Sequence, residues 1–134
     1  MKILVGYDGA KHSGELIDTA VKHANAFKAN VHILISTPYS PEVTPEKIEQ
    51  TEKDLDRIKR RFKTEDLHCE IKVLSGSMTP AEDLVAYAID HDIDEIIIGV
   101  KKRSKIGKFI MGSTAQYIIM EAPCNVLIAK TAKR

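Results

Sequence analysis

The residues best suited to chemistry in this sequence lie in its last third and have the types that hold a phosphate group. Gly112-Ser113-Thr114 opens a segment with helical spacing, and a helix start presents unpaired N–H groups and a partial positive charge. The glycine would let the chain turn tightly and let an anion approach the backbone, and Ser113 adds a hydroxyl donor. The preceding loop is rich in cations: Lys101, Lys102, Arg103, Lys105 and Lys108. This stretch predicts a site for a polyanion such as a triphosphate.

Each of these features also has a simpler interpretation. Gly112 and Ser113 could serve only to start a helix, with Ser113 and Gln116 as a capping box. A basic loop alone is more often a solvated turn than a ligand site. Asp8, which precedes Gly9, could cap a turn. The phosphate hypothesis therefore depends on whether the fold gathers these residues at one place.

The apolar pattern predicts five short strands separated by four helices. Strands are expected at 2–7, 31–35, 69–74, 95–99 and 125–129, and helices at 13–28, 46–62, from 79 past 89, and 113–122. The clearest helix start is at Thr79, which can cap, with Pro80 at the first helical position and Glu82 completing a capping box. Strict alternation of strands and helices predicts an α/β fold: a doubly wound five-stranded parallel sheet with helices on both faces.

The expected topology places the candidate residues on one edge of that sheet. Open parallel sheets bind ligands beyond the carboxyl ends of their strands, where the strand order reverses. With a flavodoxin-like order, the strands at 2–7 and 95–99 are neighbours, so Asp8-Gly9 and Gly99 end side by side. The loop after the second of these strands leads to Gly112. We therefore expect one crevice to hold all of these residues.

Composition limits the class of protein. The chain has 134 residues, 43% hydrophobic and 29% charged, and a formal net charge of +1, which fits a single domain over 1–134. Nucleic-acid binders usually carry a strong basic excess, and membrane spans need roughly 20 apolar residues in a row. Cys69 and Cys124 form no Cys-x-x-Cys pair. We expect a soluble cytoplasmic protein that binds neither nucleic acid nor membrane.

Several enzyme classes lack their motifs here. The sequence has no G-x-x-x-x-G-K-[ST] loop, no G-x-G-x-x-G after the first strand and no G-x-S-x-G elbow. A receiver domain needs an aspartate at the end of the third strand, where this chain has Leu74-Ser75-Gly76. The five histidines show no metal-ligand spacing. No catalytic residue and no metal ligand is predicted.

The sequence resembles the universal stress protein family along nearly its whole length. The segments that carry the resemblance are Ile3 to Gly9 with Ser13, Gly76, Ala81 to Leu84, Ile96 to Gly99, Gly112 to Thr114, and Ala122 to Ile128. The ATP-binding branch of the family has the motif G-x2-G-x9-G-[ST]. Gly99, Gly112 and Ser113 match it, and Lys102 stands at its second glycine.

The resemblance implies an adenine nucleotide alpha hydrolase-like fold and a set of nucleotide-binding residues. By this likeness Asp8 would bind adenine or ribose with Tyr7 beside it, the backbone of Ser36 would read adenine, and Gly76 would lie near base and sugar. Ribose and phosphates would be held by Gly99, Gly112, Ser113 and Thr114, with Lys102 in the motif. The implied ligand is ATP or a related adenine nucleotide, with Mg²⁺ or Mn²⁺.

Two functions remain open. The first is a nucleotide-binding stress-response or regulatory protein with at most slow ATP hydrolysis, because no general base is evident. The alternative is a dimeric interaction protein of the same family that binds no nucleotide, which Lys102 favours. Both imply a homodimer through the apolar segment 125–129, since an exposed edge strand invites pairing with another chain.

Overall fold

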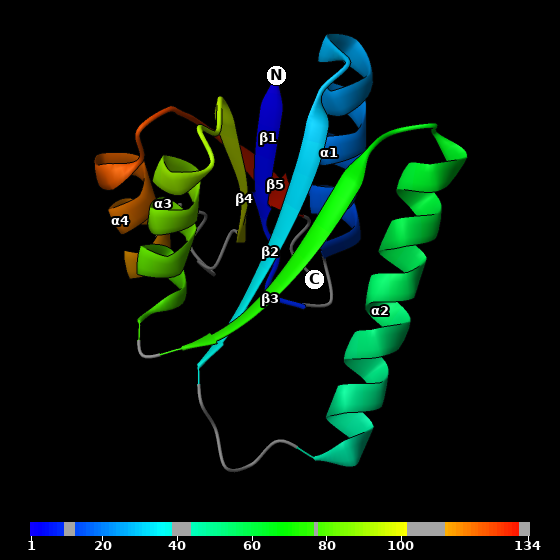
Figure 1. Cartoon of the computed structure of the whole chain (residues 1–134). Coiled ribbons are helices and arrows are strands. Elements are labelled where there is room, and N and C mark those ends of the chain that lie inside the picture. The colour runs from blue at the N-terminus through cyan, green and yellow to red at the C-terminus, as the bar shows by residue number, and fades with distance from the viewer. Residues whose placement is uncertain (10–12, 39–43, 77, 102–111, 132–134) are drawn as a thin grey trace, which may run out of the picture.

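The computed structural model describes residues 1–9, 13–38, 44–76, 78–101 and 112–131 (Figure 1). Strands and helices alternate along the chain. Its strands are β1 (Lys2–Gly6), β2 (Asn30–Pro38), β3 (Cys69–Gly76), β4 (Glu95–Lys101) and β5 (Asn125–Thr131). Its helices are α1 (Ser13–Phe27), α2 (Pro45–Thr64), α3 (Pro80–Asp90) and α4 (Ser113–Glu121).

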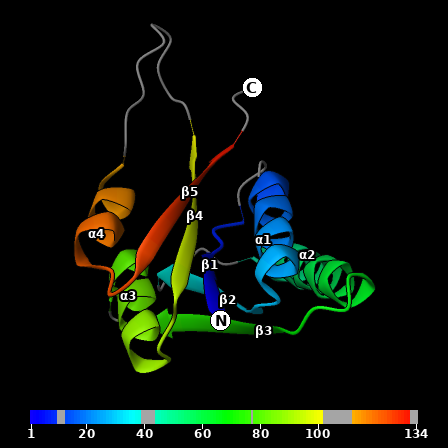
Figure 2. The same cartoon turned by 90° about the horizontal axis from the view of Figure 1, so that it is seen from above.

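The strands form one parallel sheet in the order β3-β2-β1-β4-β5. Helices α1 and α2 cover one face, and α3 and α4 cover the other (Figures 1 and 2). This confirms the predicted fold class, including the neighbouring positions of β1 and β4. The strand order reverses between these two strands, since β2 and β3 lie to one side of β1, and β4 and β5 to the other.

Two hydrophobic clusters, one on each face, hold the layers together. In β1 the side chains alternate, so Ile3 and Val5 join the cluster under α1 and α2, and Leu4 joins the one under α3 and α4. Because β1 is buried on both faces, its sequence is continuously apolar instead of alternating. The burial of the central strands thus gives the fold a rigid middle from which the strand ends project.

Four strands, β2 to β5, are longer than the sequence predicts. β2 continues past Ile35 to Pro38, because Thr37 and Pro38 pair with Ser75 and Gly76 of β3. β4 continues to Lys101, since its last two residues pair with those of β5. Lys101, which the sequence analysis places in the basic loop, therefore belongs to β4. Backbone pairing extends each strand beyond the point at which its apolar pattern stops.

The helix starts give one confirmed prediction and one wrong one. Thr79 caps α3: its Oγ1 accepts from the N–H of Glu82 at 3.2 Å and donates to Glu82 Oε1 at 2.9 Å, with Pro80 next in the chain. The capping box predicted at Ser113 is wrong. The N-cap of α4 is Gly112, which has no side chain with which to cap, and Ser113 is already the first helical residue.

Helix α2 lies on the surface, as its charged sequence predicts. Its buried residues are Ile58 and Phe62, both in the carboxyl half, and Ile48 in the amino half is exposed. Only this half is therefore anchored in the core. None of the helices in the described part of the chain is long and apolar enough to cross a bilayer.

Candidate functional site

The carboxyl end of β1 is held by the neighbouring strand before the chain turns away. The N–H of Tyr7 donates to the carbonyl of Leu34 at 3.1 Å, which prolongs the pairing of β1 with β2 by one residue. Asp8 is exposed, and Gly9 has a φ of +77°, a conformation that glycine adopts without strain. Asp8 thus lies at the carboxyl end of the sheet, on the turn that follows β1. The hydrogen bond between Tyr7 and Leu34 fixes the backbone just before this turn.

The end of β4 lies directly beside this turn. Ile98 pairs with Gly6, so Gly99 follows at the level where Tyr7 leaves β1. Gly99 also pairs with Ala129 of β5 and is exposed. The structure therefore brings Tyr7, Asp8 and Gly99 together at the reversal of strand order, which is where parallel sheets of this kind bind ligands.

The start of α4 completes this edge. Because α4 follows β4 and runs back along the sheet, its first turn lies on the side where the strands end (Figure 2). Gly112, Ser113 and Thr114 are all exposed. Gly112 has φ −71° and ψ 163°, which any residue adopts, and no described atom lies within 4 Å of a Cβ built there. The backbone conformation at Gly112 is therefore not the tight turn expected from the sequence, and it does not require a glycine. What Gly112 provides instead is space in front of the first turn of α4 that no other described atom occupies.

Ser36 lies near the end of β2 and is held by a residue that the sequence analysis missed. Its hydroxyl donates to Oδ2 of Asp83, in the first turn of α3, and Asp83 is only 4% exposed. A short acidic run at a helix start is common, so Asp83 attracts no notice. One sequence signal could have found it. Asp83 precedes the core residue Leu84 and lies four positions before Tyr87, which places its carboxylate on a buried face of the helix.

Helix α3 also comes close to the end of β1. A Cβ on Gly6 would lie 3.3 Å from Leu84 Cδ2, so glycine permits a close approach between strand and helix here. Together with the contact between Ser36 and Asp83, this packing fixes α3 relative to the ends of β1 and β2. The helix that supports this edge is therefore tied to both strands.

The remaining predicted residues are less central or lie outside the described part of the chain. Gly76 ends β3 opposite Pro38, so it shares the carboxyl edge but is separated from β1 by β2. Lys101 ends β4. Lys102, Arg103, Lys105 and Lys108 fall outside the described residues. Among the described residues, no group of three histidine, cysteine or acidic side chains is placed to hold a metal ion.

An open hollow of about 480 Å³ lies elsewhere, between the end of α2 and the start of β3. Its lining residues are Lys59, Phe62, Lys63, Asp66, Leu67, His68 and Cys69. Burial raises the pKa of the Cys69 thiol to about 11, so this thiol stays protonated at neutral pH and is a poor nucleophile. The hollow offers no evident chemistry, and we place the candidate site at the carboxyl edge instead.

Known proteins resemble this chain over almost its full length. A universal stress protein of Thermus aquaticus is 28% identical over 138 residues, covering 96% of this chain and 97% of that protein. One of Methanocaldococcus jannaschii is 26% identical, covering 99% of this chain and 84% of that protein.

Solved structures share the fold. A universal stress protein from Archaeoglobus fulgidus matches with a TM-score of 0.79 and 26% identity, covering 96% of this chain and 97% of that one. Another from the same organism, in complex with dAMP, has a TM-score of 0.73 and 22% identity, with 96% of both chains covered. A universal stress protein in complex with cAMP has a TM-score of 0.75 and 23% identity, with 98% of both chains covered.

The family assignment rests on the whole domain. The sequence model of the universal stress protein family matches residues 1–130. This range contains all nine helices and strands except Thr131, the last residue of β5. The fold, the strand order and the relatives agree with that match. This chain belongs to the universal stress protein family.

Proposed function

We propose that this protein binds an adenine nucleotide at the carboxyl edge of its sheet and acts in a stress-response or regulatory role. One observation carries the proposal: Tyr7 and Asp8 end β1 beside Gly99 of β4, where the strand order reverses. Related structures hold dAMP and cAMP, which share the adenine base and a phosphate. Both kinds of group have matching partners at this edge.

The charges at the carboxyl ends of the strands favour one orientation of the bound nucleotide. Asp8 carries an exposed carboxylate after β1, to which base or ribose can donate hydrogen bonds, and the buried carboxylate of Asp83 in α3 lies against Ser36 of β2; both charges would repel a phosphate. The start of α4, by contrast, presents backbone N–H groups and the positive end of a helix dipole. We therefore assign base and ribose to Tyr7, Asp8, Ser36 and Gly76. Phosphates are assigned to Gly99, Gly112, Ser113 and Thr114.

ATP is the proposed ligand within this class, with Mg²⁺ or Mn²⁺ neutralising part of its phosphate charge. A carboxylate such as Asp8 accepts hydrogen bonds, and in this proposal it binds base or ribose and is not assigned the role of a general base. Any hydrolysis would rest on Mg²⁺ and phosphate positioning alone and would be slow. The proposed role is therefore nucleotide binding, not turnover.

The experiment that tests the proposal has two parts. Mass spectrometry of the protein purified under native conditions should show a bound adenine nucleotide. Titration calorimetry of nucleotide-free protein with ATP, with and without Mg²⁺, should then give a saturable heat. The absence of both would favour the alternative function, an interaction protein of this family that binds no nucleotide.

Lys102 separates the two functions, because it stands where the nucleotide-binding motif has its second glycine. Under the proposal its ammonium group offsets phosphate charge. We expect Lys102→Gly to weaken ATP binding about tenfold, roughly one charge-assisted hydrogen bond, and to weaken AMP binding less. Calorimetry at two salt concentrations measures this. Tighter ATP binding in the variant would instead show that the lysine obstructs the site.

We also propose a homodimer formed through β5. This strand is an edge of the sheet, and its side chains Val126, Leu127 and Ile128 are only partly buried. An apolar edge strand is favourable for pairing with a second copy. Sedimentation velocity at micromolar concentration should show a dimer, and Leu127→Lys should shift it toward monomer. A wild-type monomer at that concentration would contradict this proposal.

A further inference from the structure

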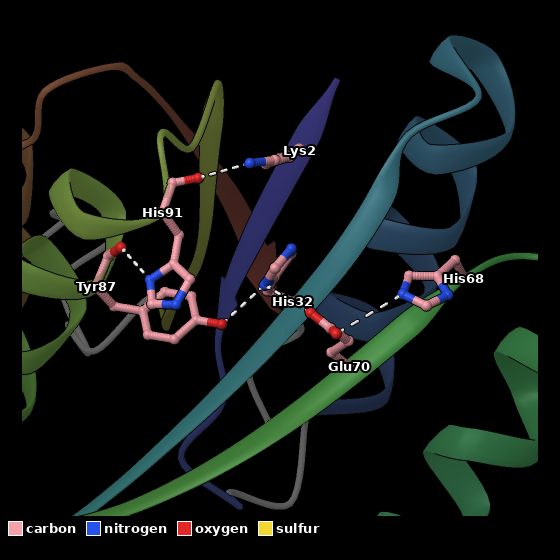
Figure 3. A network of polar contacts seen from close by, with 6 residues as sticks. All are labelled: Lys2, His32, His68, Glu70, Tyr87 and His91. Atoms are coloured by element: carbon pink, nitrogen blue, oxygen red, sulfur yellow. Dashed lines mark hydrogen bonds and ion pairs between the residues drawn. The ribbon is translucent and has the colours of Figure 1, made fainter.

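A cluster of ionisable side chains lies between β2, β3 and α3, away from the carboxyl edge (Figure 3). His32, in β2, is at its centre and only 8% exposed. It sits on the face of β2 that carries α3, since Val31 and Ile33 on either side belong to the opposite cluster. The other members of this histidine cluster are Lys2, His68, Glu70, Tyr87 and His91.

One nitrogen of His32 has two neighbours of different chemistry. Its Nδ1 lies 2.8 Å from the Tyr87 hydroxyl and 3.4 Å from Glu70 Oε2. Figure 3 shows the imidazole between these two groups, one from α3 and one from β3. A phenol can donate to this nitrogen, whereas a carboxylate can only accept from it. The protonation state of Nδ1 therefore decides which neighbour it binds.

The Tyr87 hydroxyl is a donor over the whole physiological range. Burial, reinforced by the charge of Glu70, raises the pKa of Tyr87, so the hydroxyl keeps its proton. The ring itself stacks on His91, with centroids 3.8 Å apart and planes 12° from parallel. The carbonyl of His91 in turn accepts from Lys2 Nζ at 3.0 Å. Tyr87 is thus held in place to meet His32.

Neutral and charged His32 make different contacts. When the proton of neutral His32 sits on Nε2, Nδ1 accepts the hydrogen bond of Tyr87. When a solvent proton binds Nδ1, that nitrogen becomes a donor, and the Glu70 carboxylate is the stronger acceptor for it. The Tyr87 hydroxyl then loses His32 Nδ1, its hydrogen-bond acceptor among the described side chains. No other bond is made or broken.

We propose that the contact between His32 and Tyr87 is a pH-sensitive link between β2 and α3, made at neutral pH and broken in acid. The link joins residues 55 positions apart and is the polar contact between the middle of β2 and the second half of α3. A buried histidine that must stay neutral to make its contact is a proton sensor in the ordinary range of cells.

The surrounding groups set the direction of the pH effect. Burial lowers the pKa of His32 below its usual 6.5, the charge of Glu70 raises it, and the cationic forms of His91, Lys2 and His68 lower it. The net direction is down, so the unfolded chain takes up a proton before the folded one does. Stability is therefore complete above pH 6.5 and falls as the pH drops below it.

The same helix reaches the proposed nucleotide site. Asp83, which binds Ser36, and Tyr87, which binds His32, are four residues apart and share the face of α3 that lies on β2. Releasing Tyr87 loosens the helix that positions Ser36. This step rests on the proposed function, and it predicts that adenine-nucleotide affinity declines between pH 7.5 and 5.5.

Nitrogen-15 NMR of the histidine rings in the full chain tests the link without any nucleotide. We expect His32 to hold its proton on Nε2 and to titrate below pH 6.5. Tyr87→Phe removes the donor to the neutral ring and should raise the pKa of His32. Glu70→Gln removes the acceptor of the charged ring and should lower that pKa. Tyr117→Phe, a matched change on α4, should leave it unchanged.

A purely structural role for these residues would not move one pKa in opposite directions. Titration of His32 at or above pH 6.5, or shifts of the same sign in the two variants, would overturn the inference. If Tyr87→Phe does not fold, the wild-type and Glu70→Gln titrations still decide it. If no nucleotide binds at any pH, the proposed function fails while the titration of His32 still decides this link.

Thermal unfolding gives a second readout. Each pKa unit by which folding lowers His32 corresponds to about 5 °C of midpoint lost in acid for a domain of this size. The wild-type midpoint should therefore fall by more than the midpoint of His32→Gln between pH 7.5 and 5.5. Equal losses in the two proteins would contradict the link.

Discussion

Replacing Asp8 with asparagine is expected to weaken adenine-nucleotide binding about ten- to hundredfold, the largest effect of any single change at the proposed site. A hydrogen bond to a charged group contributes about 1.5–3 kcal/mol, and tenfold in affinity is about 1.4 kcal/mol. Asp8 is exposed on the turn that ends β1, so the substitution leaves the core untouched. Isothermal titration calorimetry with ATP and with AMP at pH 7.5 measures the change.

The comparison of ligands shows what Asp8 contacts. Because the carboxylate is assigned to base or ribose, ATP and AMP should lose affinity by the same factor. A loss confined to ATP would place Asp8 near the phosphates or a metal ion instead, and would reverse the assigned direction of the ligand.

Asp90→Asn is the matched control. Asp90 is the last residue of α3, exposed and at the opposite edge of the sheet from Asp8. The change removes the same charge from the protein, so it tests whether net charge alone alters the binding of an anion. We expect less than a twofold effect. Equal losses in both variants would remove Asp8 from the site.

The fold and the position of the candidate site in it were predictable because they depend on local patterns. Short apolar runs, or alternation in the strand at 69–74, marked the five strands, and helical spacing marked the segments between them. Alternation of the two then implied a parallel sheet, and a parallel sheet implied that Asp8 and Gly99 would end together. Each step uses neighbours in sequence or a general rule of topology.

The contacts that depend on the placement of α3 on the sheet were not predictable. Ser36 binds Asp83 and His32 binds Tyr87 across 47 and 55 residues, and both require a particular rotation of the helix. Burial of Asp83 cannot be read from an acidic helix start, which usually lies in solvent. The same holds for the start of α4, where the pattern favoured Ser113 as the cap and the chain uses Gly112.

Phe62→Ala should destabilise the protein by about 3–5 kcal/mol, the range for truncating a large aromatic side chain in a core. Phe62 is 0% exposed and lies in the carboxyl half of α2, the half that reaches the core under α1 and α2. Domains of this kind are stable by about 5–15 kcal/mol, so this one change would remove a large share. Urea unfolding followed by circular dichroism gives the free energy.

Ile48→Ala on the same helix separates core packing from helix propensity. Ile48 is 51% exposed in the amino half of α2, where alanine is the better helix former, so we expect a change within about 0.5 kcal/mol. Comparing the Phe62 and Ile48 variants shows whether α2 is anchored only through its carboxyl half, as the burial of Ile58 and Phe62 indicates. A loss at Ile48 comparable to that at Phe62 would mean that another surface covers the amino half of α2 in solution, and the proposed homodimer would then have to include this helix as well as β5.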